Sequence, residues 1–425
     1  MKLSVEGYKS IADKCTVEFN GLTVLAGANS SGKSSFMQPL LLIKQTLEST
    51  YDAKGLILDG VNVRLTDSSQ IISKVCENKD FFAIELETDG KWTRAEFQLG
   101  KRTGVENKRL QYKDANLTQE LTLEMGLSQK AIEDIVNQLP EHQKQYLNVF
   151  RDHDMKVIVR RGRNAFLTLS ADRNFFPAFG NFSDSLETVS QRLIHVPGLR
   201  GNPERLYKVT QSEGAHFVGS FEPYVASIIH QWSETNSPHF EALQENLRQL
   251  GLTSNIRSQQ ENDTQLQLEV ALHKQQSDKD DFVNIADVGF GVSQTLPVLV
   301  ALLTARKGDL IYIEQPELHL HPNAQYALAE IIIKAVKNGR RVVIETHSSL
   351  LLTGIQTAVA KHQLNDEQVS LNWFTQDDTG ITNVKAVRLD KYGRFNDWPA
   401  DFDEVALRAE SDYLDAVEEA MRNES

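Results

Sequence analysis

A short segment near the start of the chain, G-A-N-S-S-G-K-S, matches the phosphate-binding loop (P-loop) pattern G-x-x-x-x-G-K-[ST] at every fixed position. A short buried strand is expected before it, at 23–26, and a helix after it, from residue 35 onward. This order turns successive backbone N–H groups towards a phosphate at a helix N-terminus. The Lys33 side chain would reach the β- and γ-phosphates, and the Ser34 hydroxyl would bind Mg²⁺. The candidate nucleotide-binding residues are Gly27, Ala28, Asn29, Ser30, Ser31, Gly32, Lys33, Ser34 and Ser35.

An acidic residue, Glu314, directly follows the buried strand expected at 309–313. A carboxylate at the end of such a strand, facing a P-loop, is where the Mg²⁺ of a bound nucleotide is held through oxygen ligands. We therefore predict Ser34 and Glu314 as the Mg²⁺ ligands. The alternative is that Glu314 only caps the turn that follows it.

Three histidines lie close to these strands. His319 and His321 form an H-x-H pattern before Pro322. A metal site is one interpretation of this pattern, but packing or hydrogen bonding around the turn before the proline is the better one. His347 lies just beyond the buried strand expected at 341–344, in a polar turn. From there its ring can reach a γ-phosphate or the attacking water.

The segment 287–294, D-V-G-F-G-V-S-Q, precedes an apolar helix expected at 295–303. A serine and backbone N–H groups at a helix N-terminus make a second phosphate site, with Gly291, Ser293 and Gln294 as the candidate residues. One triphosphate rarely needs two such loops within one subunit. We therefore predict a head-to-tail dimer, in which this loop closes over the nucleotide held by the other subunit's P-loop. The alternative is an ordinary glycine-containing loop with a helix cap.

These elements, in this order, resemble those of the ATP-binding cassette (ABC) ATPases of the SMC and RecF kind. Residues 27–34 match Walker A, and residues 287–294 match a degenerate signature loop. Residues 311–315 match Walker B, and residues 317–322 match the D-loop region after it. His347 matches the switch histidine. The resemblance implies ATP and Mg²⁺ as cofactors.

A narrower resemblance rests on four further stretches: 195–200 and 203–207, the wording I-E-Q-P-E-L-H-L-H-P at 313–322, and the tail at 393–399 with Phe402. They are similar to one bacterial family of AAA ATPases that carry a short C-terminal domain of unknown function. Relatives include the ATPase subunits of Septu-type and PARIS-type anti-phage systems and the ATPase half of OLD nucleases. The resemblance implies an ATP-driven sensor or scaffold with a separately encoded effector, for which a nuclease is one candidate.

The sequence departs from the transporter and SMC pattern at the end of Walker B. Those proteins have Asp-Glu there, and the second acid polarises the attacking water, whereas this chain has Glu314 and Gln315. An amide cannot act as a general base, and losing a positioned base costs roughly 10²–10⁴ in rate. We therefore predict firm ATP binding, ATP-dependent dimerisation and slow hydrolysis. The predicted catalytic group is Glu314, Gln315 and His347, with Glu317 or His347 as the residue that orients water.

Composition bounds the remaining functions. The 425 residues carry a formal net charge of −13, so the protein is not a generic nucleic-acid coat, and any DNA contact needs a local basic patch or a partner. A basic cluster at Arg160, Arg161 and Arg163, with Lys156 and Arg151 nearby, is either a hairpin tip for phosphates or a plain solvated turn. No apolar run approaches the ~18 residues of a membrane span, and two cysteines are too few for a disulfide framework. We expect a cytoplasmic protein with no membrane partner.

The elements that must position these residues alternate between strands and helices from 283 onward, which favours a parallel α/β core. Hairpins are expected at 81–99 and 156–169. The predicted fold is an α/β ABC-ATPase core with an N-terminal antiparallel β layer and a helical insertion. The predicted domains are 1–50 with 283–375 as the ATP-binding core, 51–282 as the β-hairpin and helical insertion, and 376–425 as a C-terminal appendage.

Three functions remain open at this point. The first is a cytoplasmic ATPase that serves an effector in anti-phage defence. The second is a DNA-binding ATPase of repair or recombination that resembles RecF, and the third is a nearly inactive nucleotide-dependent scaffold. We expect no intrinsic nuclease, because the short stretch after His347 has acids but no clear pair with strand-end spacing for two metal ions.

Overall fold

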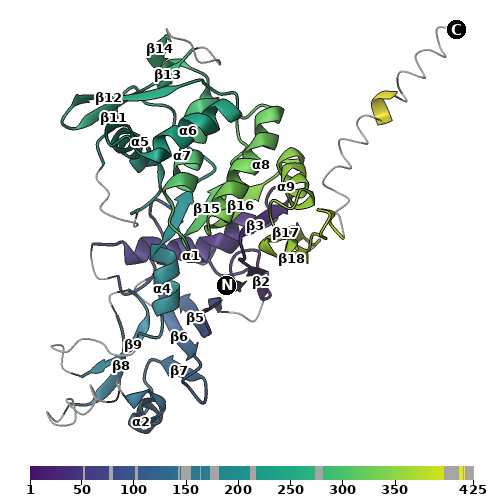
Figure 1. The fold of residues 1–425 in the computed structure, drawn as a ribbon. Helices are drawn as coiled ribbons and strands as arrows, with labels where there is room; N and C mark the ends of the chain where they lie inside the picture. Colours follow the sequence, from purple (N-terminus) through teal and green to yellow (C-terminus); the bar gives the residue numbers. More distant parts are fainter. Residues whose placement is uncertain are drawn as a thin grey trace.

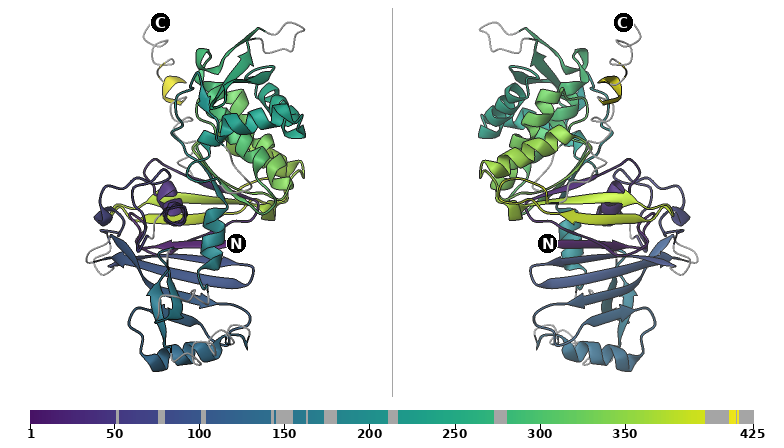
Figure 2. Two further views of the ribbon diagram at one scale, coloured as in Figure 1. Left: turned by 90° about the vertical axis from the view of Figure 1, so that its left-hand side faces the viewer. Right: turned by 90° about the vertical axis from the view of Figure 1, so that its right-hand side faces the viewer.

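The computed structural model describes residues 1–50, 53–75, 80–100, 104–141, 144, 155–162, 164–172, 181–210, 217–272, 281–396, 411–414 and 416. Two six-stranded sheets form the centre of the molecule, one mostly parallel and one antiparallel. Figure 1 shows the elements along the chain, and Figure 2 shows the two sheets lying one above the other.

The parallel sheet has the strand order β10-β15-β16-β3-β17-β18. All neighbouring pairs are parallel except β17 and β18, which pair antiparallel. Its strands are short and rich in β-branched and other apolar residues, as expected for a sheet that is covered on both faces. Their bounds are β3 (Leu22–Gly27), β10 (Leu193–Val196), β15 (Leu310–Glu314), β16 (Arg341–Thr346), β17 (Val369–Gln376) and β18 (Thr382–Val387).

Helices cover both faces of this sheet because successive side chains of a strand point to opposite sides. Ile311 and Ile313 pack in one core with residues of α7, α8 and α9, whereas Leu310 and Tyr312 pack in a second core with α1 and the antiparallel sheet. The helices are α1 (Lys33–Leu47), α7 (Phe290–Thr304), α8 (Pro322–Lys337) and α9 (Ser349–Ala360).

The antiparallel sheet has the order β2-β1-β4-β5-β6-β7. Its inner face is lined by alternating apolar residues such as Leu3 and Val5, and by Phe82 stacked on Phe97 with ring centroids 5.2 Å apart. The antiparallel sheet therefore covers the side of the core around α1 that faces away from the parallel sheet. The strands are β1 (Lys2–Glu6), β2 (Cys15–Glu18), β4 (Phe81–Thr88), β5 (Lys91–Leu99), β6 (Val105–Lys113) and β7 (Leu121–Glu124).

Smaller groups of elements flank the two sheets. At one end a four-stranded sheet packs with two helices: β11 (Tyr207–Lys208), β12 (Ile256–Asn262), β13 (Gln265–Ala271), β14 (Phe282–Asn284), α5 (Val225–Glu234) and α6 (Pro238–Gln249). Towards the other end lie β8 (Val157–Arg161), β9 (Leu167–Ala171), α2 (Gln129–Gln138) and α4 (Asp184–Gln191). Single 3₁₀ turns occur at Ser68–Gln70, Glu222–Tyr224, Ile285–Asp287 and Asp366–Gln368.

The predicted α/β fold class is confirmed by this arrangement of a parallel sheet, an antiparallel layer and helices. The hairpins predicted at 81–99 and 156–169 are β4–β5 and β8–β9. The middle region holds helices α5 and α6 together with most strands of the antiparallel sheet, and its strand β10 pairs with β15 in the parallel sheet. Among the described residues, no helix has both the length and the hydropathy to cross a membrane.

Candidate functional site

The P-loop lies between β3 and the first turn of α1. Gly27, Ser30 and Gly32 have positive φ angles of 143°, 64° and 100°, a backbone pattern that directs neighbouring N–H groups to one concave side. Gly32 is the N-cap of α1 and supplies no side-chain cap, so the first N–H groups of the helix keep their donors for a ligand. The Ser31 hydroxyl is buried and has no hydrogen-bond partner within the described part of the chain. This donor set fits a phosphate group.

The Lys33 side chain turns back on the loop that precedes it. Its Nζ donates to the carbonyl oxygens of Gly27, at 3.0 Å, and Ala28, at 2.7 Å. Burial lowers the pKa of this ammonium group, and the nearby Glu345 opposes that effect. Ser35 is half-buried in the first helical turn, and the exposed tip of the loop is formed by Ala28, Asn29 and Ser30.

The Ser34 hydroxyl donates to the carboxylate of Glu345, with oxygen–oxygen distances of 3.0 and 2.9 Å. Glu345 lies near the end of β16, the strand between the P-loop strand and the Walker B strand. The Tyr312 hydroxyl donates to the same carboxylate at 3.0 Å. A buried acid that was not predicted from the sequence is therefore the hydrogen-bond acceptor of Ser34.

Glu314 lies beside Glu345 on the neighbouring strand, in direct register. Its Oε1 atom is 3.2 Å from the Nε2 atom of His195, and its Oε2 atom accepts a hydrogen bond from the Gly198 backbone N–H at 3.1 Å. The His195 ring is buried and stacks on Tyr312, with centroids 5.4 Å apart. The side chain of Glu314 thus faces the loop after β10 and does more than cap the next turn.

The two carboxylates have opposite pKa shifts. Burial first, and then the charge of Glu314, raise the pKa of Glu345. Burial also acts to raise the pKa of Glu314, but the hydrogen bonds and charge of His195 and the Gly198 N–H outweigh it and lower the pKa. The two neighbouring acids therefore lie in different electrostatic environments.

Glu317 and His347 form the next part of this sheet edge. The Oε1 atom of Glu317 accepts hydrogen bonds from the Thr346 hydroxyl, at 2.7 Å, and from the His347 backbone N–H, at 3.0 Å. Its Oε2 atom is buried without a partner among the described residues. Burial and the charge of Lys33 lower the pKa of His347, although its contact with the Gly27 backbone opposes this. The imidazole therefore lies beside the P-loop and is neutral at pH 7.

Gln315 continues the strand end with a left-handed φ of 45°, and its backbone N–H donates to the Glu345 carbonyl oxygen at 2.7 Å. The H-x-H residues after it serve the turn. His321 is the N-cap of α8 and accepts a hydrogen bond from the Asn323 backbone, and His319 contacts the Phe290 ring. No group of three or more metal-binding side chains occurs among the residues described.

Much of the predicted signature loop is helical. Helix α7 begins at Phe290, after the extended N-cap residue Gly289, so Gly291, Ser293 and Gln294 lie in its first turns. The Ser293 hydroxyl donates to the Phe290 carbonyl oxygen at 3.1 Å. The Gln294 side chain is buried and donates to the Gly201 carbonyl oxygen at 2.9 Å.

A buried arginine joins this helix to the end of β15. Arg200 is 5% exposed, and its guanidinium donates to three carbonyl oxygens, those of Gln294, Glu314 and Gln315. Burial lowers the pKa of Arg200, and the charges of Glu222, Glu317 and Glu314 oppose that shift. The start of α7 and the edge that carries the acids are thus held together by one side chain.

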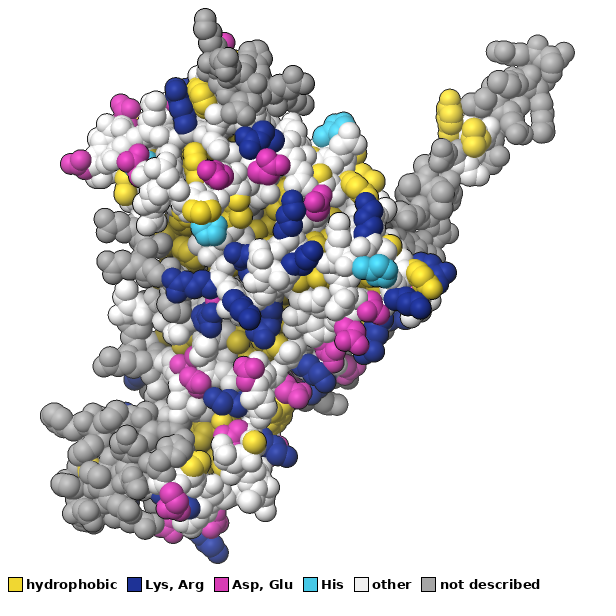
Figure 3. All heavy atoms as spheres, viewed as in Figure 1, with side chains coloured by type: hydrophobic (Ala, Val, Ile, Leu, Met, Phe, Trp, Pro, Cys, Tyr) yellow, Lys and Arg dark blue, Asp and Glu magenta, His cyan; other side chains and the backbone are white. Residues whose placement is uncertain are grey.

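The predicted basic cluster is only partly described. Arg161 forms an ion pair with Glu106 at 2.8 Å, which indicates a structural role for this side chain. Arg163 and Arg151 lie outside the described residues. Elsewhere, Lys and Arg side chains gather across the middle of the face shown in Figure 3, although the net charge is −13.

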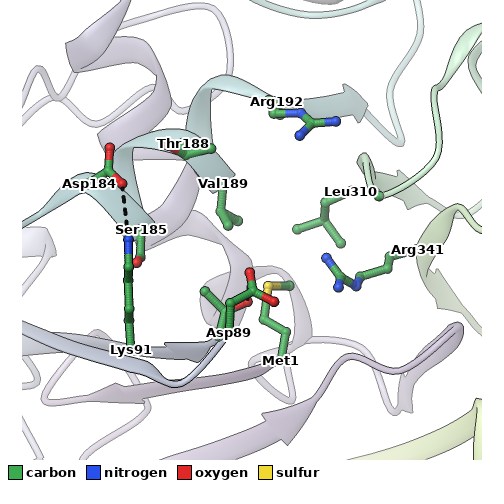
Figure 4. Close-up of a pocket in the computed structure, with 12 residues that line it drawn as sticks. Met1, Asp89, Lys91, Asp184, Ser185, Thr188, Val189, Arg192, Leu310 and Arg341 are labelled. Atoms are coloured by element: carbon green, nitrogen blue, oxygen red, sulfur yellow. Dashed lines mark hydrogen bonds and ion pairs between the residues drawn. The ribbon is translucent and has the colours of Figure 1, made fainter. Parts of the chain in front are cut away.

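A cavity of about 170 Å³ lies at the amino ends of the parallel strands, opposite the end that carries the P-loop (Figure 4). Leu310 and Arg341 are the first residues of β15 and β16, so this is the edge where the strands begin. Arg192 lines the cavity with Arg341, and the ion pair between Lys91 and Asp184 lies across from them. The cavity is therefore separate from the carboxyl ends of β3, β15 and β16, where the P-loop lies, which we call the P-loop edge.

Four residues at the P-loop edge were not predicted as site residues: His195, Glu345, Tyr312 and Arg200. Glu345, like Glu314, is an acid at the end of a buried apolar strand, so the same pattern could have identified it. In that segment only His347 was assigned a role. Arg200 belongs to the stretch 195–200, which supports the narrower family resemblance, but the sequence indicated no chemical role for its side chain. Its burial depends on β10 joining the parallel sheet.

A family model described as "AAA ATPase domain" matches residues 1–352. Among curated proteins, the "Old nuclease" of Escherichia phage P2 is 38% identical over 64 residues, which is 15% of this chain and 10% of that protein. The similarity thus spans about one tenth of that relative's length.

Similar solved structures include heads of SMC proteins. They are the SmcHead bound to the C-winged helix domain of ScpA (13% identity, TM-score 0.46, 92% of this chain and 98% of that chain) and the SMC head domain from Thermotoga maritima (11%, 0.40, 90% and 97%). A third is the Smc head domain with an extended coiled coil bound to the C-terminal domain of ScpA derived from Pyrococcus furiosus (11%, 0.42, 91% and 96%).

Gly27→Ala should disrupt the P-loop. A Cβ atom there would lie 2.1 Å from the Phe374 carbonyl oxygen, and the φ of +143° is unfavourable for alanine. The matched control is Gly90→Ala in the β4–β5 turn, where φ is +73° but nothing lies within 4 Å of the added atom. We expect Gly27→Ala to lower the melting temperature clearly more than Gly90→Ala and to abolish binding of a fluorescent ATP analogue. Equal melting temperatures for the two variants would contradict the crowding.

Glu345→Gln should stabilise the nucleotide-free protein. The raised pKa means that the folded state binds the proton of Glu345 more tightly than the unfolded chain does, so this group's contribution to the free energy of unfolding falls as pH rises above its usual value of 4.5. Glutamine removes that loss. We expect the variant to melt on the order of 2 °C higher than the wild type at pH 8, with a smaller difference at pH 5. If the variant melts at a lower temperature than the wild type at pH 8, the negative charge of Glu345 is stabilised by its surroundings in the folded protein, which contradicts the prediction.

Proposed function

The chain belongs to the AAA ATPase domain family, and from this premise we propose that it binds ATP·Mg²⁺ at the P-loop edge and hydrolyses it slowly. We further propose that ATP joins two copies head to tail in the cytoplasm. The assembly then acts as a sensor or scaffold for a separately encoded effector, such as a nuclease, in anti-phage defence.

The proposal is carried by the convergence of four side chains at one sheet edge. Lys33 and Ser34 come from the P-loop, and Glu345 and His347 come from the end of the adjacent strand. Lys33 is positioned to exchange its two loop carbonyls for phosphate oxygens. His347, neutral beside Gly27, can hydrogen-bond a γ-phosphate or a water molecule.

Mg²⁺ would be held by the Ser34 oxygen and by a carboxylate at a strand end, for which Glu314 is the residue that the Walker B motif predicts. The oxygen donors at this edge suit Mg²⁺, which prefers oxygen ligands. When bound, the ion would neutralise charge on the β- and γ-phosphates. The cationic Lys33 side chain would then attract the phosphates, and the carboxylate would act on them only by holding the ion.

Slow hydrolysis follows from Gln315. Its amide can hold a water molecule but cannot take the proton that leaves during attack. Glu317 has a carboxylate oxygen that no described residue contacts by a hydrogen bond, close to His347, so it is the acid best placed to substitute. Glu317 nonetheless uses its other oxygen on two donors from β16 and the residue after it, which limits its freedom to reorient.

Dimerisation would add the first turn of α7 from a second copy. Phe290 at its start is 49% exposed, and Ser293 is partly exposed. Arg200 connects this turn to β15, so a nucleotide that fixes the turn in one copy also acts on the strand end of the same copy.

The defence role is supported by the resemblance to the ATPases of anti-phage systems and agrees with the partial similarity to the phage P2 Old nuclease. The second candidate function is a DNA-binding ATPase of the RecF or SMC kind. The gathering of Lys and Arg side chains in Figure 3 favours it, since a local basic surface can bind phosphates on an acidic protein.

Lys33→Ala should abolish nucleotide binding and ATP-dependent association. We expect the wild-type mass, measured by light scattering, to double in ATP and to remain that of one chain without nucleotide, with slow turnover. The variant should stay a monomer in both conditions. Turnover that rises on addition of DNA, with salt-sensitive DNA binding and no ATP-dependent dimer, would favour the second candidate.

Gln315→Glu should raise turnover by roughly 10²-fold or more because it restores a general base at the strand end. The backbone strain at φ 45° is the same for both residues, so folding should be unaffected. Gln315→Ala is the control, and it should not accelerate hydrolysis. If Gln315→Glu turns over as slowly as the wild type, the glutamine is not what limits the rate.

A further inference from the structure

Glu345 is the buried acid whose role neither the motif nor the family assigns. It is 5% exposed, and two hydroxyl groups, those of Ser34 and Tyr312, donate hydrogen bonds to it. Neutral donors compensate a buried carboxylate less well than a cation does. The nearest cation, Lys33, acts on it through charge but donates its hydrogen bonds to Gly27 and Ala28.

The position of Glu345 is the second observation. In a P-loop ATPase the hydroxyl of the serine after the lysine binds Mg²⁺ and needs an acceptor for its proton. Here both oxygens of Glu345 lie within 3.0 Å of the Ser34 oxygen. β16 pairs directly with the P-loop strand, whereas β15, which carries Glu314, is one strand further away.

Glu314 is held in another direction. One carboxylate oxygen contacts His195 and the other accepts from the Gly198 backbone N–H. His195 is itself fixed by Asn62, 3.0 Å from its Nδ1 atom, and by the face of Tyr312. Moving Glu314 towards Ser34 would break both of these contacts, the one with His195 in β10 and the one with Gly198 in the loop after it.

We propose that Glu345 is the carboxylate that holds Ser34 and the Mg²⁺ of the bound nucleotide, and that Glu314 instead anchors the loop after β10. The proposed carboxylate ligand thus lies on β16, the strand next to the P-loop strand, and not on β15 as the Walker B motif predicts. Tyr312 is a positioning residue, because its hydroxyl holds one oxygen of Glu345 in place. The inference rests on the proposed function, since it names the metal ligand of that same site.

The test compares Glu345→Gln with its matched control Glu314→Gln in the full-length protein. Both substitutions keep the size of the side chain and remove one acid at the same level of neighbouring strands. The readout is the affinity for a fluorescent ATP analogue with EDTA and over a titration of Mg²⁺. Melting curves without nucleotide check that each variant folds.

We expect Glu345→Gln to lose the gain in nucleotide affinity that Mg²⁺ provides, by at least about tenfold, and to bind metal-free nucleotide like the wild type. Glu314→Gln should keep that gain. Electron paramagnetic resonance with Mn²⁺ in place of Mg²⁺ should show the ion released from the nucleotide complex of Glu345→Gln only. Tyr312→Phe should give a smaller loss of the same sign, which supports the positioning role.

The proposal is overturned if Glu314→Gln loses the Mg²⁺ gain and Glu345→Gln keeps it, or if both variants lose it or both keep it. These outcomes leave the proposed function intact, because the wild type still binds Mg²⁺ and nucleotide in each of them. Failure of the proposed function is a separate result: the wild type would then bind no nucleotide that Lys33→Ala fails to bind.

Discussion

Two carboxylates at the same level of neighbouring strands govern the architecture of the P-loop edge. Glu314 and Glu345 are in register and largely buried, so their charges repel each other in a region of reduced dielectric. The structure separates their environments: His195 stabilises the charge of Glu314, and Ser34 and Tyr312 donate hydroxyl hydrogen bonds to Glu345. The contact with Ser34 brings the first turn of α1 into the same network, so the loop, two strands and β10 are connected through one pair of charges.

Arg200 extends this network to α7. A buried guanidinium is costly unless its donors are satisfied and opposite charge is near. Here the two terminal nitrogens of Arg200 donate to three carbonyl oxygens and several acids lie around it, whereas its Nε atom has no partner among the described residues. Its acceptors lie on two elements, the first turns of α7 and the end of β15. A displacement of either element changes the hydrogen bonds of the other, which connects α7, the predicted second phosphate site, directly to the strand that ends in Glu314.

The sequence predicted the elements that local signals specify. The P-loop pattern, the buried strands and the two hairpins depend on neighbouring residues, and the fold class followed from the alternation of strands and helices. The role of β10 (Leu193–Val196) was not predictable, because a four-residue strand acquires its meaning only from pairing with β15, far along the chain. The acceptor of Ser34 was missed for a related reason. Motif spacing identifies an acid at a strand end but does not give the order of the strands in the sheet. That order places Glu345, on the strand next to β3, nearer to Ser34 than Glu314 is.

The strand order also has a consequence for the synthesis of the protein. β3, which leads into the P-loop, is made early, but its two neighbours in the sheet are Arg341–Thr346 and Val369–Gln376. A nascent chain therefore carries both edges of this strand unpaired until residues 341–376 have been made, whereas the strands of the antiparallel sheet all precede residue 125. The antiparallel layer can form on the ribosome around α1, and the nucleotide site forms last. A truncated product that lacks the last strands would keep a folded layer and an exposed apolar strand, which makes it prone to aggregation.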